Sequence, residues 1–251
     1  MIDFHTHILP GIDDGCRNIE EACSLLNMLE QQGVDTVVLT PHYYGRRSDV
    51  SNFLEKRTVA FEKLKAHYRG NIRFVLGCEC NIVTCVNSNF SELIPLSIGN
   101  TSYILIELSF DRKWSNMVWQ RIESLIDLGL IPIIAHVELY PEVKRQPGVV
   151  KKLVDYGCLI QINCDSVLDK KLYSLVKALI THKQVHCLGS DAHNMFSRIP
   201  HYFDANEKIQ KLISKNAAIR LQQDMKGILN NHILNLQTSV PVSRTVLGQY
   251  R

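Results

Sequence analysis

Short apolar runs rich in β-branched residues recur along this chain and alternate with longer helical patterns, and this alternation constrains the fold most strongly. Near-continuous apolar strands between helices favour a parallel sheet whose outer face is covered. No glycine-rich phosphate loop follows a strand, so we expect a barrel and not an open doubly wound sheet. Seven strands predict an α/β protein with a distorted (β/α)₇ TIM-like barrel, one strand short of the standard form. The predicted strands cover residues 2–5, 34–40, 72–78, 103–108, 131–136, 158–163 and 185–189.

The helical patterns divide the chain without a visible linker. Asn18, with Glu21 three residues later, is typical of a helix start, and an apolar stripe at helical spacing follows it. We predict one barrel domain over residues 1–237 and a polar, poorly ordered tail over residues 238–251. Further helices are expected at residues 52–68, 115–128, 149–156, 166–182 and 203–222.

Composition and charge exclude several classes of protein. Lys and Arg total 28 against 25 Asp and Glu, and the resulting net charge of +3 is too small to predict a nucleic-acid partner. No apolar run is long enough to span a membrane, and the chain start lacks the basic and apolar regions of a signal peptide. The eight cysteines are scattered and lie mostly in apolar runs, as reduced buried cysteines do. We therefore expect a cytoplasmic protein without membrane insertion.

Histidines and carboxylates stand where the predicted strands end. Six of the seven strand ends carry one, and in a (β/α) barrel these ends share the face where active sites lie. Side chains tens of residues apart should therefore meet in space, whereas the other five histidines fall elsewhere and we interpret them as structural or surface residues. With one aspartate from the first loop, the candidates are His5, His7, Asp14, His42, Glu79, Glu107, His136, Asp191 and His193.

Imidazoles and carboxylates without a cysteine suit zinc, manganese or iron, and do not suit a structural thiolate site. Nine candidates exceed the ligands of one ion, so we predict a binuclear or trinuclear centre. Such centres generate hydroxide near neutral pH, and they stabilise both the attacking and the leaving oxygen in the hydrolysis of a phosphate ester. The sequence has no cysteine with an arginine six positions later, and no GxSxG, HExxH, Walker or GxGxxG motif. Hydrolysis by metal-bound hydroxide is the hypothesis that remains.

These motifs resemble the polymerase-and-histidinol-phosphatase (PHP) superfamily. More narrowly, the chain is similar to the bacterial manganese-dependent protein-tyrosine phosphatases that are encoded with capsule and exopolysaccharide genes. The resemblance covers roughly residues 1–225. It rests on the opening MIDFHTHILPGIDDG with Glu20-Glu21-Ala22, and on Thr40-Pro41-His42, Gly77-Cys78-Glu79, Ile106-Glu107, Ile134-Ala135-His136 and Ser190-Asp191-Ala192-His193-Asn194.

The resemblance implies a seven-stranded PHP barrel with three divalent metal ions, expected to be manganese, although iron and zinc accept the same ligands. All nine candidates match the family's ligand positions. The implied substrate and partner is a phosphotyrosine-bearing bacterial tyrosine autokinase that controls polysaccharide export. Arg198 matches an arginine expected to hold the phosphate, and Asp191 and His193 are the candidates for the general acid. Self-association of the chain stays open.

One position departs from the family pattern. The family commonly carries an arginine after His-x-Glu, whereas this chain has Leu139 there, which cannot donate a charged hydrogen bond to phosphate. Either Arg198 suffices, or Arg46 or Arg47 after His42 also binds substrate, or activity is weaker.

Three other functions stay open at this point. The chain could be another PHP hydrolase that acts on a small ester such as histidinol phosphate or a nucleotide. It could be a metal-dependent nuclease of the TatD type, although that family lacks the closing Asp-x-His. It could also be a catalytically silent, metal-binding regulatory module, a reading that Leu139 keeps open.

Overall fold

The strands curl around a common centre and pair in parallel throughout. The computed structural model describes residues 1–45, 49–85, 90–236, 240–245 and 249–250. Within these residues the strands are β1 (Ile2–Thr6), β2 (Thr36–Leu39), β3 (His42–Tyr43), β4 (Arg73–Leu76), β5 (Glu79–Asn81), β6 (Tyr103–Glu107), β7 (Ile131–Ile134), β8 (Leu159–Asn163) and β9 (Cys187–Gly189).

The neighbouring strands form two sheets, β1-β2-β4 and β3-β5-β6-β7-β8-β9, which backbone hydrogen bonds connect at both ends. The N–H of Gly77 donates to the carbonyl of Leu39 at 2.9 Å, where β2 and β4 continue into β3 and β5. At the other end, the N–H of Asp191 donates to the carbonyl of His5 at 2.8 Å. The chain just after β9 therefore lies against β1, which brings the first and last strands together.

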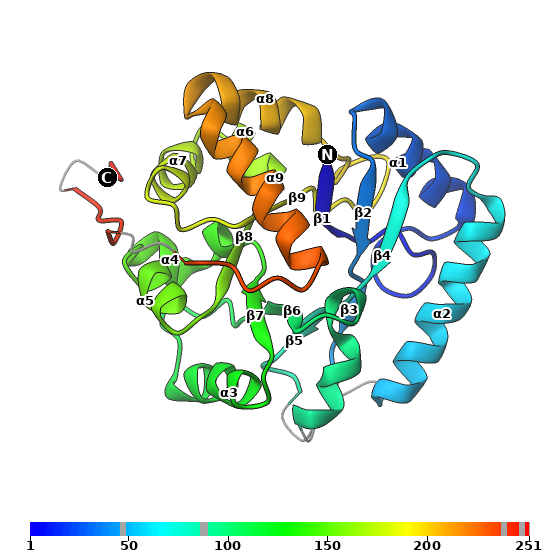
Figure 1. The fold of residues 1–251 in the computed structure, drawn as a ribbon, viewed down its shortest axis with the longest axis horizontal. Helices are drawn as coiled ribbons and strands as arrows, with labels where there is room; N and C mark the ends of the chain where they lie inside the picture. The colour runs from blue at the N-terminus through cyan, green and yellow to red at the C-terminus, as the bar shows by residue number, and fades with distance from the viewer. Residues whose placement is uncertain (46–48, 86–89, 237–239, 246–248, 251) are drawn as a thin grey trace.

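Helices cover the outside of the strands (Figure 1). Helices α1 and α2 lie beside β1, β2 and β4, while α3, α4 and α5 lie beside β7 and β8 (Figure 1). The α-helices are α1 (Ile19–Gln31), α2 (Val50–His67), α3 (Asn116–Asp127), α4 (Pro141–Arg145), α5 (Val149–Asp155), α6 (Cys164–Leu168), α7 (Tyr173–Thr181), α8 (Tyr202–Leu212) and α9 (Lys215–Leu229). The described residues also form three 3₁₀ helices, η1 (Phe90–Leu96), η2 (Ile98–Asn100) and η3 (Val137–Leu139).

Several predicted elements are divided in the structure. The predicted strands at 34–40 and 72–78 continue as the separate short strands β3 and β5, and the first break falls at Pro41, which has no N–H to donate to a ladder. The single helices predicted at 166–182 and 203–222 are wrong, because each is two helices. In the second case the side chain of Ser214 accepts from the N–H of Ala217 and starts α9, which runs on to Leu229.

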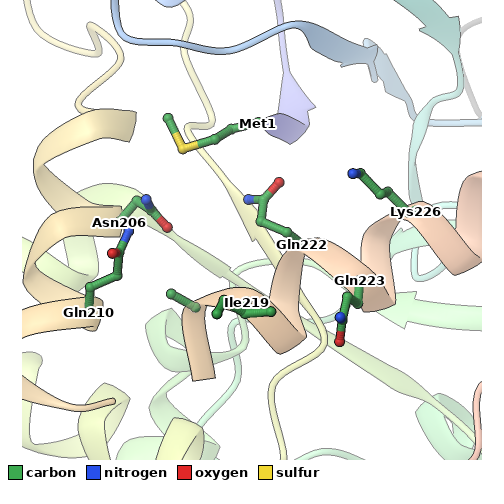
Figure 2. A pocket seen from close by; sticks show the side chains of 8 residues that line it. Met1, Asn206, Gln210, Ile219, Gln222, Gln223 and Lys226 are labelled. Atoms are coloured by element: carbon green, nitrogen blue, oxygen red, sulfur yellow. The ribbon is translucent and has the colours of Figure 1, made fainter. Parts of the chain in front are cut away.

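The amino ends of the strands are covered by α8 and α9. The N–H of Ile2 donates to Gln222 Oε1 at 3.0 Å, and the Tyr202 hydroxyl donates to the carbonyl of Ile2. A pocket of about 370 Å³ lies here, and Figure 2 shows Met1 facing amide side chains from both helices, including Asn206 and Gln222. Helices α8 and α9 thus hold the start of β1, and a pocket remains between them.

The cysteines and the tail add two observations. All eight cysteines are free and seven are buried, which confirms the prediction of reduced, buried thiols. In the tail, Val242 is buried and the carbonyl of Val240 accepts from Gln184 Nε2 at 2.8 Å. Among the residues described, we find no helix whose length and apolar character would let it cross a membrane.

His186 makes the fold sensitive to acid. Its buried Nδ1 accepts from the N–H of Ile160 at 3.1 Å, and burial together with the charge of Arg220 lowers its pKa to about 3. Protonation therefore favours the unfolded chain as the pH falls below 6.5, the ordinary value. In His186→Asn, Oδ1 keeps the acceptor without the titration. We expect wild type to lose about 2 kcal/mol more than this variant in unfolding free energy between pH 7 and pH 5.

Urea titrations at both pH values measure this difference. The exposed His67 on α2 offers the control, since His67→Asn should keep the wild-type loss. Equal acid sensitivity of wild type and His186→Asn would rule out the proposed origin.

Candidate metal centre

All nine predicted ligands lie close together, on the face where β1, β6, β7 and β9 end and where β2 and β4 lead into β3 and β5. β1 carries His5 and leads into His7, while β3 carries His42 and β5 carries Glu79. Glu107 is the last residue of β6, and His136 follows β7. Asp191 and His193 follow β9, and Asp14 stands on the loop between β1 and α1.

Glu79 is the centre of the cluster and is only 1% exposed. Its Oε1 lies 2.8 Å from His136 Nε2. Its Oε2 lies 3.0 Å from His42 Nδ1 and 3.2 Å from Nε2 of both His5 and His7. Burial opposes the negative charge of Glu79, but the surrounding imidazoles outweigh it and hold the pKa of this carboxyl well below its usual range.

Asp191 forms a second point of convergence. Its Oδ1 lies 3.4 Å from His7 Nε2, 3.5 Å from His193 Nδ1 and 3.6 Å from His5 Nε2. Its Oδ2 accepts from Arg198 Nη2 at 2.6 Å. Burial opposes its charge, but His5, His7 and Arg198 outweigh burial and lower the pKa of Asp191.

Two further carboxylates lie at the edge of the cluster. Asp14 Oδ1 lies 3.6 Å from His42 Nε2 and 3.5 Å from His193 Nε2, and its side chain is 66% exposed, which marks the mouth of the site. Glu107 Oε1 lies 3.8 Å from His136 Nε2, while its Oε2 accepts from Asn81 Nδ2 at 2.6 Å. Burial and the charge of Glu79 raise the pKa of Glu107.

The hydrogen bonds of the histidines fit a divalent cation. His5 Nδ1 donates to Gln161 Oε1, and His7 Nδ1 donates to Asp13 Oδ2. In the neutral rings both Nε2 atoms therefore carry lone pairs, yet they face each other at 3.0 Å beside Glu79 Oε2. Lone pairs that converge in this way are the arrangement of metal ligands.

Unpaired buried atoms support the same fit. His193 Nδ1 donates to the carbonyl of Asp191, which leaves Nε2 with its lone pair, and this atom and Asp191 Oδ1 are buried without a hydrogen-bond partner among the described residues. Among the described residues there are three groups in which all the possible ligand atoms lie within 4.8 Å of one another, and the groups share members. They are His7, Asp14, His42 and His193; His5, His7 and Glu79; and His42, Glu79 and Glu107.

The cluster as a whole stabilises positive charge. Burial disfavours a charged His7, but Asp13 and Glu79 outweigh burial and raise its pKa to about 10. Burial opposes the charge of His136 too, yet Glu79 raises its pKa to about 9. Burial and the charge of His7 instead lower the pKa of His193 to about 3, which keeps its ring neutral. Protons and metal ions therefore compete for the same nitrogens.

Asp13 is a functional residue that the sequence analysis missed. Besides its 2.7 Å hydrogen bond from His7 Nδ1, its Oδ2 accepts from the N–H of His42 at 2.9 Å. Its Oδ1 accepts from the N–H of Gly15, where an added Cβ would lie 2.0 Å from the carbonyl oxygen of His7. The adjacent Asp13-Asp14 pair marks both carboxylates in the sequence, whereas the sequence analysis predicts a role only for Asp14.

Two neutral amides of β8, Gln161 and Asn163, contact three of the candidate ligands. Gln161 Oε1 accepts from the N–H of His136 at 2.7 Å as well as from His5. Gln161 Nε2 donates to Asn163 Oδ1, and Asn163 Nδ2 donates to Asp191 Oδ2 at 2.8 Å. β8 is the one predicted strand whose end lacks a histidine or a carboxylate, so charge gave no signal there.

The backbone is strained at two of the candidate ligands. His136 and Asp191 have φ values of 32° and 55°, in the left-handed region that residues other than glycine rarely adopt. Such strain persists where surrounding contacts fix it, as the hydrogen bonds of Gln161 and Asn163 do here.

A cleft of about 350 Å³ opens beside the cluster. Arg198, 42% exposed, and Asp191 line it on the cluster side. Leu139 lines it as well, together with the carboxylates of Asp165 and Asp169. Of the predicted phosphate-binding arginines, only Arg198 can be located, since Arg46 and Arg47 lie outside the described residues.

Comparison with known proteins gives consistent matches over nearly the whole chain. A model of the family described as capsular polysaccharide synthesis, CpsB/CapC, matches residues 1–229. The tyrosine-protein phosphatase CpsB of Streptococcus pneumoniae is 30% identical over 244 residues, which is 89% of this chain and 96% of that protein. The tyrosine-protein phosphatase YwqE of Bacillus subtilis strain 168 is 28% identical over 260 residues, or 98% of each chain.

Solved structures agree with the sequence matches. A chain from the crystal structures of YwqE from Bacillus subtilis and CpsB from Streptococcus pneumoniae, described as unique metal-dependent tyrosine phosphatases, superposes with a TM-score of 0.82 at 27% identity. The match covers 97% of this chain and all of that chain. The phosphotriesterase homology protein of Escherichia coli has a TM-score of 0.53 at 12% identity over 89% of this chain, which shows a shared fold alone.

Asp13→Ala should weaken metal binding although every candidate ligand stays in place. The variant removes the acceptor that orients His7 and the loop before His42. We expect the affinity of chelator-treated protein for Mn²⁺, measured by calorimetry, to fall by about 10- to 100-fold. Asp155→Ala, which removes an exposed carboxylate from α5, is the matched control and should bind as wild type does. Unchanged affinity in Asp13→Ala would show that Asp13 does not orient a ligand.

Proposed function

The chain belongs to the CpsB/CapC family of capsular polysaccharide synthesis proteins, and we propose that it is a metal-dependent protein-tyrosine phosphatase. The observation that carries the proposal is the convergence of histidines and carboxylates from strands across the fold on the buried Glu79. The named activity of its relatives over nearly their full length supports the same conclusion.

We propose that the nine candidate residues hold three divalent ions, with manganese as the working metal. His7 and His42 each belong to two of the three ligand groups, as does Glu79, and this overlap favours ions that share ligands. When bound, such ions activate water as a nucleophile and neutralise the oxygens of a phosphate ester. Asp13, Gln161 and Asn163 orient the ligands but do not bind metal in this proposal.

Arg198 is proposed to hold the phosphate group. Its guanidinium lies at the cleft with one Nη2 bond to Asp191, and its remaining donors can form a forked pair with phosphate oxygens. Leu139, which lines the same cleft, cannot donate a charged hydrogen bond, so among the described residues of this cleft Arg198 is proposed to make the contact. Arg46 and Arg47 stay proposed substrate-binding residues.

Asp191 and His193 remain the proposed catalytic residues beside Arg198. Asp191 contacts both Arg198 and the imidazole cluster, so it couples the position of the phosphate to the position of the ligands. The phenol of tyrosine has a pKa of about 10, so its phenolate leaves more readily than the alkoxide of serine and needs little acid assistance. A neutral His193 is consistent with that weak requirement.

We propose a bacterial tyrosine autokinase that regulates capsule or exopolysaccharide synthesis as the substrate and partner, with the reaction taking place in the cytoplasm. The catalytic unit would be a seven-stranded PHP barrel over residues 1–237, in which β2 with β3 and β4 with β5 each count as one interrupted strand. The tail over residues 238–251 is not needed for this chemistry.

Phosphate release from a phosphotyrosine peptide tests the proposal. Chelator-treated protein should be inactive, added Mn²⁺ should restore release, and a phosphoserine peptide of the same sequence should react far more slowly. Manganese-bound protein that releases phosphate only from small esters would favour another hydrolase of the superfamily. No release from any ester, with metal bound, would identify a regulatory metal protein.

Replacement of Arg198 should separate phosphate binding from metal binding. We expect Arg198→Ala to lower kcat/KM for the peptide by about 10- to 100-fold while the manganese content, measured by mass spectrometry, stays at the wild-type level. Arg145→Ala is the matched control, because Arg145 is equally exposed and is also paired to a carboxylate, that of Glu142. A wild-type rate in Arg198→Ala would move the phosphate contact to another residue.

A further inference from the structure

Phe110 is a large apolar side chain, 51% exposed, directly beside the candidate metal centre. Its ring centroid lies 5.9 Å from that of His136 and 4.9 Å from that of Tyr140. His136 Nε2 in turn lies 2.8 Å from Glu79, the most central carboxylate. The exposed part of the ring therefore belongs to the mouth of the site and not to a distant surface.

The loop that carries Phe110 is fixed on both sides of it. The Tyr140 hydroxyl accepts from the N–H of Leu108 at 2.9 Å, and Trp114 Nε1 donates to the carbonyl of Ser109 at 2.8 Å. Tyr140 and Trp114 are buried and pack edge to face, with centroids 5.5 Å apart. The aromatic ring is thus held ready at the site before any ligand arrives, which lowers the entropic cost of a contact with it.

We propose that Phe110 is a specificity-determining residue whose ring packs against the phenyl ring of a phosphotyrosine substrate. This inference rests on the proposed phosphatase function, and it assigns Phe110 to one side of the substrate site. In an aryl phosphate the ring is bonded to the ester oxygen, so a phosphate at the cluster places that ring at the mouth, within reach of Phe110. An alkyl phosphate or inorganic phosphate has no ring to bury there.

The other exposed phenylalanine near the site is a weaker candidate. Phe196, 81% exposed, lies on the loop between His193 and Arg198, but no ring contact in the described part of the chain ties it to a histidine of the site. The ring of Phe110 does contact a histidine of the site, His136, and its contact with Tyr140 fixes its orientation.

Aromatic packing of this kind stabilises bound substrate and transition state alike, so its loss should appear in KM. For the manganese-loaded protein, we expect Phe110→Ala to raise KM for a phosphotyrosine peptide about tenfold, with kcat nearly unchanged. Phe110→Tyr, which restores a ring, should return KM to the wild-type range. The inhibition constant of inorganic phosphate and the manganese content should be the same in all three proteins.

Phe203→Ala is the matched control, because Phe203 is 48% exposed at the start of α8, where its N–H contacts Gln32 beyond the end of α1, and it should leave KM unchanged. An unchanged KM in Phe110→Ala, or an equal loss of phosphate affinity, would overturn the inference. Failure of the phosphatase proposal is distinct, since wild type would then release no phosphate from the peptide. In that case calorimetry with phenylphosphonate against inorganic phosphate decides: selective loss of phenylphosphonate binding in Phe110→Ala supports the subsite, and equal binding overturns it.

Discussion

A buried carboxylate surrounded by imidazoles is the constraint around which this structure is built. Taking the charge of Glu79 out of water is costly unless opposite charge and hydrogen bonds compensate it. The compensation comes from His5 and His7 near β1, His42 on β3 and His136 after β7. No segment alone could supply these partners, so the cluster forms only when the strands have curled around it.

The contact between β1 and the chain after β9 shows how fold and site depend on each other. The backbone bonds from Asp191 to His5 and from His7 to Ala192 bring together the first and last strands. The same bonds set the imidazoles of His5 and His7 against the Asp191 carboxylate. At Gly189 an added Cβ would lie 2.5 Å from the Cβ of His5, so this close approach requires glycine. The same backbone contacts therefore join the first and last strands and place the candidate ligands.

The sequence predicted that the nine candidate ligands meet on one face, because parallel strands end on one side and this turns positions along the chain into neighbours in space. It could not predict Gln161 or Asn163, since neutral amides carry no charge signal. The Asp13-Asp14 pair marks both carboxylates, but the spacing does not encode that Asp13 contacts the Nδ1 atom of His7. The sequence also missed the division of the long helices, because apolar periodicity continues across the break before Ser214. The start of α9 is set by the hydrogen bond from the N–H of Ala217 to the side chain of Ser214, which apolar periodicity does not reveal.

The cluster itself does not explain selectivity among phosphate esters. Imidazoles, carboxylates and the ions they suit act on the phosphorus and its oxygens, which every monoester shares. Discrimination has to come from groups outside the cluster that meet the rest of the substrate. The described rim offers two different surfaces, the fixed apolar ring of Phe110 near His136 and a cleft with Leu139 and the carboxylates of Asp165 and Asp169 near Arg198. An aryl ring suits the first surface, whereas the second offers an apolar side chain and two carboxylates beside Arg198. Under the proposed function, selection for a phosphotyrosine within a protein would draw on both surfaces.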